Sequence, residues 1–203
     1  MMTEFASATR RPPGITPSQT VGPFFHSMLT PHDYNVPPVF SSDLTAGTGL
    51  TQSIRIAGRV FDADGAAVVD AMIEIWQADA KGDYATSEAV LEGNRRPFHG
   101  FGRCDTGKDG GFSFTTLKPG AVMGPDNKPQ APHLAVNVFG RGLLKHLTTR
   151  FYFAGEPDNA HDPVLALVPA KRRDTLMLKQ DASGIWKLDI HLDGAQETVF
   201  FGV

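Results

Sequence analysis

Hydrophobic side chains recur at every second position in several short stretches of the chain, which is the period of a β-strand. In HLAVNVF, which starts at His133, a leucine and two valines alternate with histidine, alanine and asparagine. The other stretches with strand character are SIRIAGRVFD from Ser53, AMIEIW from Ala71, FSFTT from Phe112, TTRFYFAG from Thr148, TLMLK from Thr175, WKLDIHL from Trp186 and ETVFF from Glu197. Turn sequences rich in Gly and Asp, such as ADG and KDGG, separate some of them. The pattern predicts an all-β fold, an antiparallel β-sandwich with long loops.

The start of the chain shows no such period and is rich in Pro, Ser and Thr. We therefore expect residues 1–50 to form an irregular N-terminal arm that packs on a partner chain, and residues 51–203 to form the sandwich. Helical periodicity is scarce. The stretch PAKRRD, Pro169–Asp174, predicts a short helix or turn.

Composition and charge narrow the functional classes. Hydrophobic residues make up 41% of the chain and charged residues 20%, which is typical of a globular protein. The formal charge is −3 and the basic residues are scattered, so nucleic-acid binding is not expected. No apolar run approaches the roughly 18–20 residues of a membrane span, and the first residues lack the apolar core of a secretory signal. The single cysteine, Cys104, favours a reducing compartment, the cytoplasm.

Candidate chemistry is sparse among the generic motifs. Side chains two apart on a strand share a face, so a second histidine beside His133 could share a metal ion with it, but Ala135 has no donor atom. Taken alone, His133 is more often a hydrogen-bonded structural residue, and Tyr84 an ordinary loop tyrosine. The chain contains no H-x-H, H-E-x-x-H, G-x-S-x-G or C-x-x-C motif and no Gly-rich phosphate loop. Generic motifs therefore indicate no self-contained active site.

Five stretches, taken in order, nevertheless resemble one family, the intradiol ring-cleaving dioxygenases. They are TPSQTVGPF (Thr16–Phe24), IEIWQADAKGDY (Ile73–Tyr84), FGRCDTGKDGGFSFTTLKPG (Phe101–Gly120), APHLAVNVFGRG (Ala131–Gly142) and TRFYFAGEP (Thr149–Pro157). The resemblance runs from about Thr16 to the C-terminus. It implies a β-sandwich, in agreement with the alternation of the strands.

The resemblance also implies a set of metal ligands. Iron-binding members of the family hold Fe(III), a hard Lewis acid, with two tyrosines and two histidines. By resemblance, Tyr84 occupies the first tyrosine position and His133 the first histidine position. Val122 stands in place of the second tyrosine, Ala135 in place of the second histidine, and Gln130 in place of an arginine that assists ring cleavage. Because Val and Ala have no lone pair, we expect this chain to bind no metal, and Tyr84 and His133 to be remnants of a former site.

The opening TPSQT-x-GPF and the closing ETVFF resemble more narrowly the members that act on 3,4-dihydroxybenzoate (protocatechuate). These pair an iron-bearing β chain with a homologous iron-free α chain, and the departures above are those of the α chain. The resemblance thus implies an obligate hetero-oligomer in which the β chain carries the non-haem Fe(III) and the ring is opened with O2. It also places the T-x-G-P loop, here Thr20, Gly22 and Pro23, in the wall of the partner's pocket, where the alternative is a plain Gly-Pro turn. Arg141 is either a cation near the pocket mouth or part of a surface or interface ion pair.

Two other functions compete with this interpretation. The chain could be a metal enzyme acting alone, with His99 or Asp126 completing a site around Tyr84 and His133. It could also be a non-enzymatic sandwich that binds small molecules. Iron analysis of the purified chain distinguishes the first alternative from an iron-free subunit. Purification without an iron-bearing sister chain would favour the second alternative.

Overall fold

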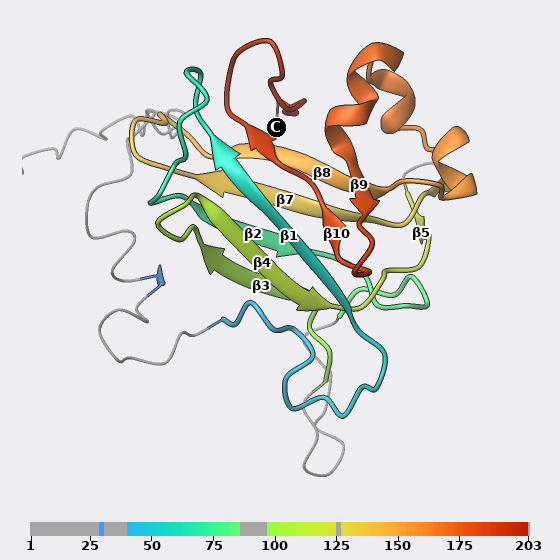
Figure 1. Ribbon diagram of the computed structural model, residues 1–203. Coiled ribbons are helices and arrows are strands. Elements are labelled where there is room, and N and C mark those ends of the chain that lie inside the picture. Colours follow the sequence, from blue (N-terminus) through green and yellow to red (C-terminus); the bar gives the residue numbers. More distant parts are fainter. Residues whose placement is uncertain (1–28, 31–39, 86–96, 125–126, 203) are drawn as a thin grey trace, which may run out of the picture.

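A computed structural model describes residues 29–30, 40–85, 97–124 and 127–202 (Figure 1). Most of its regular structure is β-strand, which confirms the predicted β-rich fold. The strands are β1 (Ile54–Phe61), β2 (Met72–Trp76), β3 (Phe101–Asp105), β4 (Gly111–Thr116), β5 (Val122–Met123), β6 (Pro129–Gln130), β7 (His133–Phe139), β8 (Leu147–Phe153), β9 (Met177–Gln180), β10 (Trp186–Lys187) and β11 (Ile190–His191). All except β3, β5 and β6 fall within or beside stretches that the alternation predicted.

The main sheet has nine strands in the order β11-β1-β10-β9-β8-β7-β2-β3, and β4 pairs with β1 outside this path. β5 and β6 form a separate two-stranded ladder. The prediction of an antiparallel arrangement was wrong in part, because β1 runs parallel to β10 and β11, and β8 runs parallel to β9. A parallel pair needs a long connection between its strands, and the segment between Phe153 and Met177 provides it for β8 and β9.

The sheet folds over so that β1 and β4 pack against β2, β7 and β8, and in Figure 1 β1 and β10 cross in front of β7 and β8. Phe112 of β4 and Phe151 of β8 meet between the layers with ring centroids 6.4 Å apart. Leu134, Val136 and Val138 all enter this core, as their alternation predicts. The opposite face of β7, which carries His133, therefore points away from the main core.

The connection from β8 to β9 contains three 3₁₀ helices, η3 (Pro157–Ala160), η4 (Leu165–Leu167) and η5 (Ala170–Leu176). The last of these confirms the short helix predicted from PAKRRD. Leu165 and Leu176 pack with Tyr152 of β8 in a second buried cluster, so these helices cover the side of β8 that faces away from the main core. No helix among the described residues is long and apolar enough to cross a membrane.

Three local features differ from the pattern that the sequence suggests. β1 and β2 follow each other across the ADG turn but do not pair, since β1 pairs with β4 and β2 with β3 and β7. The stretch ETVFF forms an isolated bridge, from Phe201 to β8, rather than a strand. Residues 42 and 44 exchange backbone hydrogen bonds of 2.9 Å with Thr115 of β4, and Leu44 enters the main core. The described end of the N-terminal segment thus packs on the main sheet of its own chain.

Candidate functional site

Tyr84 lies in the loop that follows β2, next to Trp76, the last residue of that strand. The two rings are stacked with centroids 6.0 Å apart and an interplanar angle of 5°. Asp79 shapes the loop, because its carboxylate accepts two backbone N–H groups of the loop at 2.8 and 3.0 Å. The Tyr84 side chain remains 40% exposed. Partial burial raises the pKa of the Tyr84 phenol and the charge of Arg150 lowers it in part, so the phenol keeps its proton at neutral pH.

Val122, the position of the second expected tyrosine, lies in β5 opposite Gln130 of β6. The loop that carries Tyr84 packs against the residues just before β5. Gly82 is needed at this contact, because its φ is +92° and a Cβ atom there would lie 2.1 Å from the carbonyl oxygen of Ala121. The fold therefore brings Val122 beside the Tyr84 loop, where it presents a buried apolar side chain without a donor atom.

His133 is the first residue of β7 and is 5% exposed. Its Nδ1 atom lies 2.7 Å from the carbonyl oxygen of Ala131. Because a carbonyl oxygen only accepts hydrogen bonds, Nδ1 carries the hydrogen and the lone pair of the neutral ring is on Nε2. Burial, and then the charge of Arg150, lower the pKa of His133, which keeps the ring neutral at pH 7. A hydrogen bond within the chain thus fixes this imidazole.

Ala135 lies opposite Trp76 of β2 and opposite Arg150 of β8. Cross-strand partners share a face, so the small alanine is flanked by an indole on one side and a guanidinium on the other. Nη1 of Arg150 donates a hydrogen bond to Oε1 of Gln130 at 2.9 Å. The resemblance expects an arginine at the position of Gln130. In this chain the guanidinium comes instead from Arg150 of β8, which is hydrogen-bonded to the Gln130 side chain.

Tyr152 and Asp162 extend this polar group into the interior. Tyr152, opposite His133 in the ladder, is fully buried, and its hydroxyl donates to Oδ1 of Asp162 at 3.1 Å. Asp162 is 1% exposed, and its other carboxylate oxygen accepts the backbone N–H of Ala131 at 2.8 Å. Burial, followed by the Asp162 charge, raises the pKa of Tyr152. Sequence reasoning missed this part of the face, although a charged residue and a tyrosine at alternate positions of TTRFYF were a signal for it.

We call Tyr84, Val122, Gln130, His133 and Ala135, together with Arg150, the remnant site. The first five were singled out from the sequence, and the fold brings them to one end of the sheet. Ladder pairs, the aromatic stack and the Arg150–Gln130 hydrogen bond connect them. In Figure 1 this end is marked by β5.

Arg141 lies at the opposite end of β7, in its connection to β8. The seven residues of β7 separate it from His133 by about 20 Å. The guanidinium is exposed and forms an ion pair with Asp70. Arg141 is therefore no part of the remnant site, and its action at a partner's pocket stays a prediction.

The remaining candidates are Thr20, Gly22, Pro23, Asp126 and His99. Thr20, Gly22 and Pro23 lie outside the described residues, as does Asp126. His99 is exposed in the segment that precedes β3. The sequence-based prediction of a pocket wall formed by the T-x-G-P loop thus stays a prediction.

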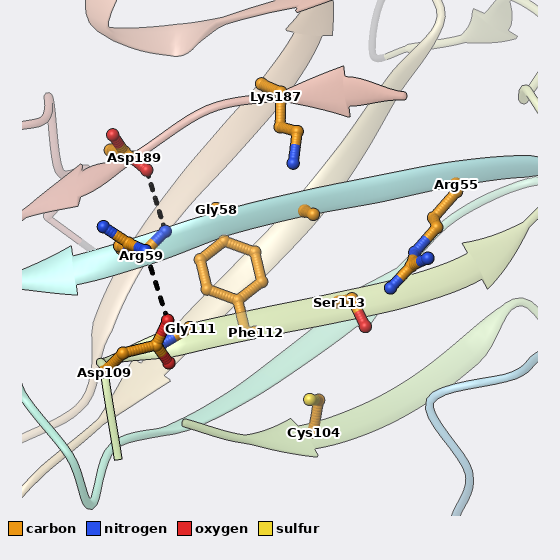
Figure 2. Close-up of a pocket in the computed structure, with 11 residues that line it drawn as sticks. Arg55, Gly58, Arg59, Cys104, Asp109, Gly111, Phe112, Ser113, Lys187 and Asp189 are labelled. Carbon is orange, nitrogen blue, oxygen red and sulfur yellow. Dashed lines mark hydrogen bonds and ion pairs between the residues drawn. The ribbon is translucent and has the colours of Figure 1, made fainter. Parts of the chain in front are cut away.

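A hollow of about 510 Å³ lies elsewhere, on the outer face of β1, β4 and β10 (Figure 2). Arg59 lies at the rim of the hollow. Its Nη2 atom forms an ion pair with Oδ2 of Asp109 at 3.3 Å, and its backbone N–H donates a hydrogen bond to Oδ1 of Asp189 at 2.8 Å. Arg55 and Lys187 also line the hollow, and neither forms an ion pair with another described residue. This surface is basic and open, and it is separate from the remnant site.

Comparison with known proteins identifies the family. A model of the dioxygenase family matches residues 21–193. The protocatechuate 3,4-dioxygenase alpha chain of Burkholderia cepacia is 41% identical over 197 residues, which cover 93% of this chain and 97% of that one. This chain belongs to the intradiol dioxygenase family.

Other intradiol dioxygenases show the same likeness. The protocatechuate 3,4-dioxygenase alpha chain of Pseudomonas putida is 37% identical over 195 residues, covering 92% of this chain and 95% of that one. The beta chain from Burkholderia cepacia is 37% identical over 138 residues, covering 64% of this chain and 57% of that one. Among solved structures, the dioxygenase domain of a carbohydrate-binding fusion protein from Streptomyces sp. SirexAA-E superposes with a TM-score of 0.58 at 25% identity, covering 89% of this chain and 99% of that one.

The remnant site does not fit the non-haem Fe(III) that the intradiol dioxygenase family uses. Of the four ligand positions that the resemblance implies, Tyr84 and His133 have a donor atom, whereas Val122 and Ala135 have none. Arg150 adds a positive charge to the same face. In the described parts of the chain, no group of three or more His, Cys, Asp or Glu side chains is placed to hold a metal ion. An ion held by two donors beside a cation would be coordinated mostly by water.

Proposed function

We propose that this chain is the iron-free α subunit of a protocatechuate 3,4-dioxygenase and works in a hetero-oligomer with a homologous iron-bearing β subunit. The observation that carries the proposal is the state of the remnant site. The positions that the resemblance assigns to the iron ligands lie at one end of the sheet, and two of them, Val122 and Ala135, have no donor atom that could coordinate iron. Similarity to alpha chains over nearly the whole length of both proteins supports the same conclusion.

The proposed reaction opens the ring of 3,4-dihydroxybenzoate between its two hydroxyl groups. Both atoms of O2 enter the product, 3-carboxy-cis,cis-muconate, so the reaction balances without an external reductant. The ferric ion of the β subunit supplies Lewis acidity that orients and polarises the substrate. In metabolism this is a step of aromatic catabolism through the β-ketoadipate pathway.

The contribution of this chain is to complete the partner's pocket rather than to hold the metal. Thr20, Gly22 and Pro23 are proposed to form part of the pocket wall, where glycine allows close approach of the backbone to a flat ring. The exposed guanidinium of Arg141 is proposed to attract the carboxylate of the substrate. Both contributions require contact with the β subunit.

Co-expression with the homologous β chain tests the proposal. The complex is expected to consume O2 with 3,4-dihydroxybenzoate, and the α chain purified alone is expected to be iron-poor, colourless and inactive. A stoichiometric iron content in the α chain alone, with a visible phenolate-to-iron absorption band, would show instead that it acts as an enzyme by itself.

A second candidate is a non-enzymatic protein that binds small molecules. The hollow lined by Arg55 and Lys187 favours it, because open cations on a sheet face suit an anionic ligand. Such a protein would be purified from its own host without an iron-bearing sister chain. Co-purification of a homologous iron protein in a fixed ratio would decide against it.

A further inference from the structure

Arg150 is the charged member of the remnant site, and the proposed function assigns it no role. It projects from β8 on the same face as Ala135 and lies directly opposite that alanine. Directly opposed residues in an antiparallel pair have Cβ atoms about 5 Å apart. The small side chain of Ala135 therefore leaves the room beside it to the guanidinium. A histidine at that position, as in iron-binding relatives, would compete for this space.

The contacts of Arg150 hold its guanidinium among the former ligand positions. It donates to the side-chain oxygen of Gln130 at 2.9 Å, and its charge lowers the pKa of Tyr152 in part, against the larger effect of burial. Its charge also acts on the phenol of Tyr84 and on the imidazole of His133. One guanidinium thus interacts with residues from β6, β7, β8 and the loop after β2.

The charge of this guanidinium is permanent, and no carboxylate of the described residues forms an ion pair with it. An arginine side chain does not lose its proton in proteins. Arg150 forms no ion pair with any residue that the structure describes, and its hydrogen-bond partner Gln130 is neutral. The nearest carboxylate among the described residues of this group, that of Asp162, accepts a hydrogen bond from Tyr152. The lone pair of His133 would therefore have to bind a metal ion close to a fixed positive charge.

We infer that Arg150 is a built-in replacement for the metal, because its guanidinium takes the space beside Ala135, bonds Gln130 and bars a metal ion from the remnant site. The inference rests on the proposed function, in which this chain carries no iron. Loss of iron binding then has two independent causes. Two donors are absent, and a fixed cation is present, so restoring the donors alone is not sufficient.

The test restores the donors with and without Arg150. The variant Val122→Tyr/Ala135→His is prepared in the full chain in three forms, with Arg150 unchanged, with Arg150→Gln and with Arg150→Lys. Each is incubated with ferrous sulfate in air and freed of unbound metal, and iron per chain and the phenolate-to-iron absorption band are measured. We expect about tenfold more iron in the Arg150→Gln form than in the other two, because the lysine keeps the charge. Equal iron with Arg150 unchanged, or no iron in the Arg150→Gln form, would overturn the inference.

A single substitution provides a test that does not need the donor-restored variant to fold. Arg150→Glu places a carboxylate where the guanidinium lies, giving a third donor beside Tyr84 and His133. The matched control is Arg55→Glu, which makes the same charge change at the hollow on β1. We expect iron and the absorption band with Arg150→Glu and neither with Arg55→Glu. Equal iron in the two would contradict the role of Arg150.

Iron binding by the unsubstituted chain distinguishes failure of the proposed function from failure of the inference about Arg150. If it binds stoichiometric iron under the same conditions, the proposed function fails. If it stays iron-poor while the donor-restored form with Arg150 unchanged fills with iron, the proposed function stands and the inference about Arg150 fails alone.

Discussion

The two ends of β7 use charged side chains in opposite ways. At the start of the strand, the side chains of Arg150, Tyr152 and Asp162 are bonded within the chain. Beyond its end, the Arg141 side chain is 71% exposed and forms a surface ion pair with Asp70. Buried polar groups that form hydrogen bonds with one another stabilise the fold and have no free bonding capacity for a ligand. An exposed cation, in contrast, can bind another molecule. We therefore expect the remnant site to contribute to the stability of this chain, and we expect Arg141 to act at the contact with the proposed partner.

The largest effect on the free energy of unfolding is expected from removing the buried hydrogen bonds of Asp162, near the start of β7. Asp162→Ala would remove the acceptor for the Tyr152 hydroxyl and the backbone N–H groups of Ala131 and Leu165. Leaving such buried donors without partners is expected to lower the free energy of unfolding by about 3 kcal/mol. Urea denaturation followed by circular dichroism measures this loss. The control is Asp158→Ala at an exposed position of η3, which should change it by less than about 0.5 kcal/mol. Similar losses in both variants would mean that the buried network adds no special stability.

The next effect concerns activity at the exposed end. In the complex with the β subunit, Arg141→Gln is expected to raise KM for 3,4-dihydroxybenzoate about tenfold, equivalent to about 1.4 kcal/mol, because a cation near the substrate carboxylate is lost. Asp70→Asn is the matched control, since it breaks the ion pair but keeps the guanidinium. Its KM should match that of the unsubstituted complex. If both variants change KM equally, Arg141 acts through the ion pair and not on the substrate.

A smaller effect appears in the dependence of stability on pH. Burial lowers the pKa of His133 in the folded chain below its usual value of 6.5. As the pH falls through 6.5, the unfolded chain takes up this proton before the folded chain does, so the free energy of unfolding decreases until the folded pKa is reached. His133→Asn should therefore reduce the difference in stability between about pH 7.5 and about pH 5.5. Urea titrations at both pH values measure it. The exposed His99→Asn serves as the control and should keep the full difference.

The smallest effect is expected at Tyr84, the other position with a donor atom that the resemblance assigns to a metal ligand. Tyr84→Phe keeps the ring that stacks on Trp76 and removes a hydroxyl from a side chain that is 40% exposed. The free energy of unfolding should change by less than about 0.5 kcal/mol. The iron content and colour of the complex should not change at all. Loss of iron from the complex with this substitution would mean that Tyr84 binds a metal ion, and it would contradict the difference proposed between the two ends of β7.

The sequence predicted the core strands because their hydrophobic side chains recur at every second residue, the period of a β-strand. Leu134, Val136 and Val138 enter the core together, as that period requires. It could not identify the parallel pairing of β8 with β9, because strand direction depends on the path of a long connection rather than on alternation. It also missed β3, where FGRCD alternates weakly and is recognised as a strand by its pairing with β2.

The candidate site was only partly visible in the sequence. Motif positions identified Tyr84, Val122 and His133, and the fold brings them to one end of the sheet. Arg150 was missed because its importance depends on register. Only the pairing of β7 with β8 places it opposite Ala135, and a slip of one residue would turn its side chain to the other face. The hydrogen bond from Arg150 to Gln130 likewise joins residues that no motif connects.

The location of iron in the assembled complex tests the central claim most directly. Crystals of the complex with the β subunit, measured at the iron absorption edge, would give the position of each iron atom by anomalous scattering. The account predicts one iron site in each β chain and no anomalous peak near Tyr84 and His133 of this chain. A peak of full occupancy bonded to Tyr84 and His133 would contradict it.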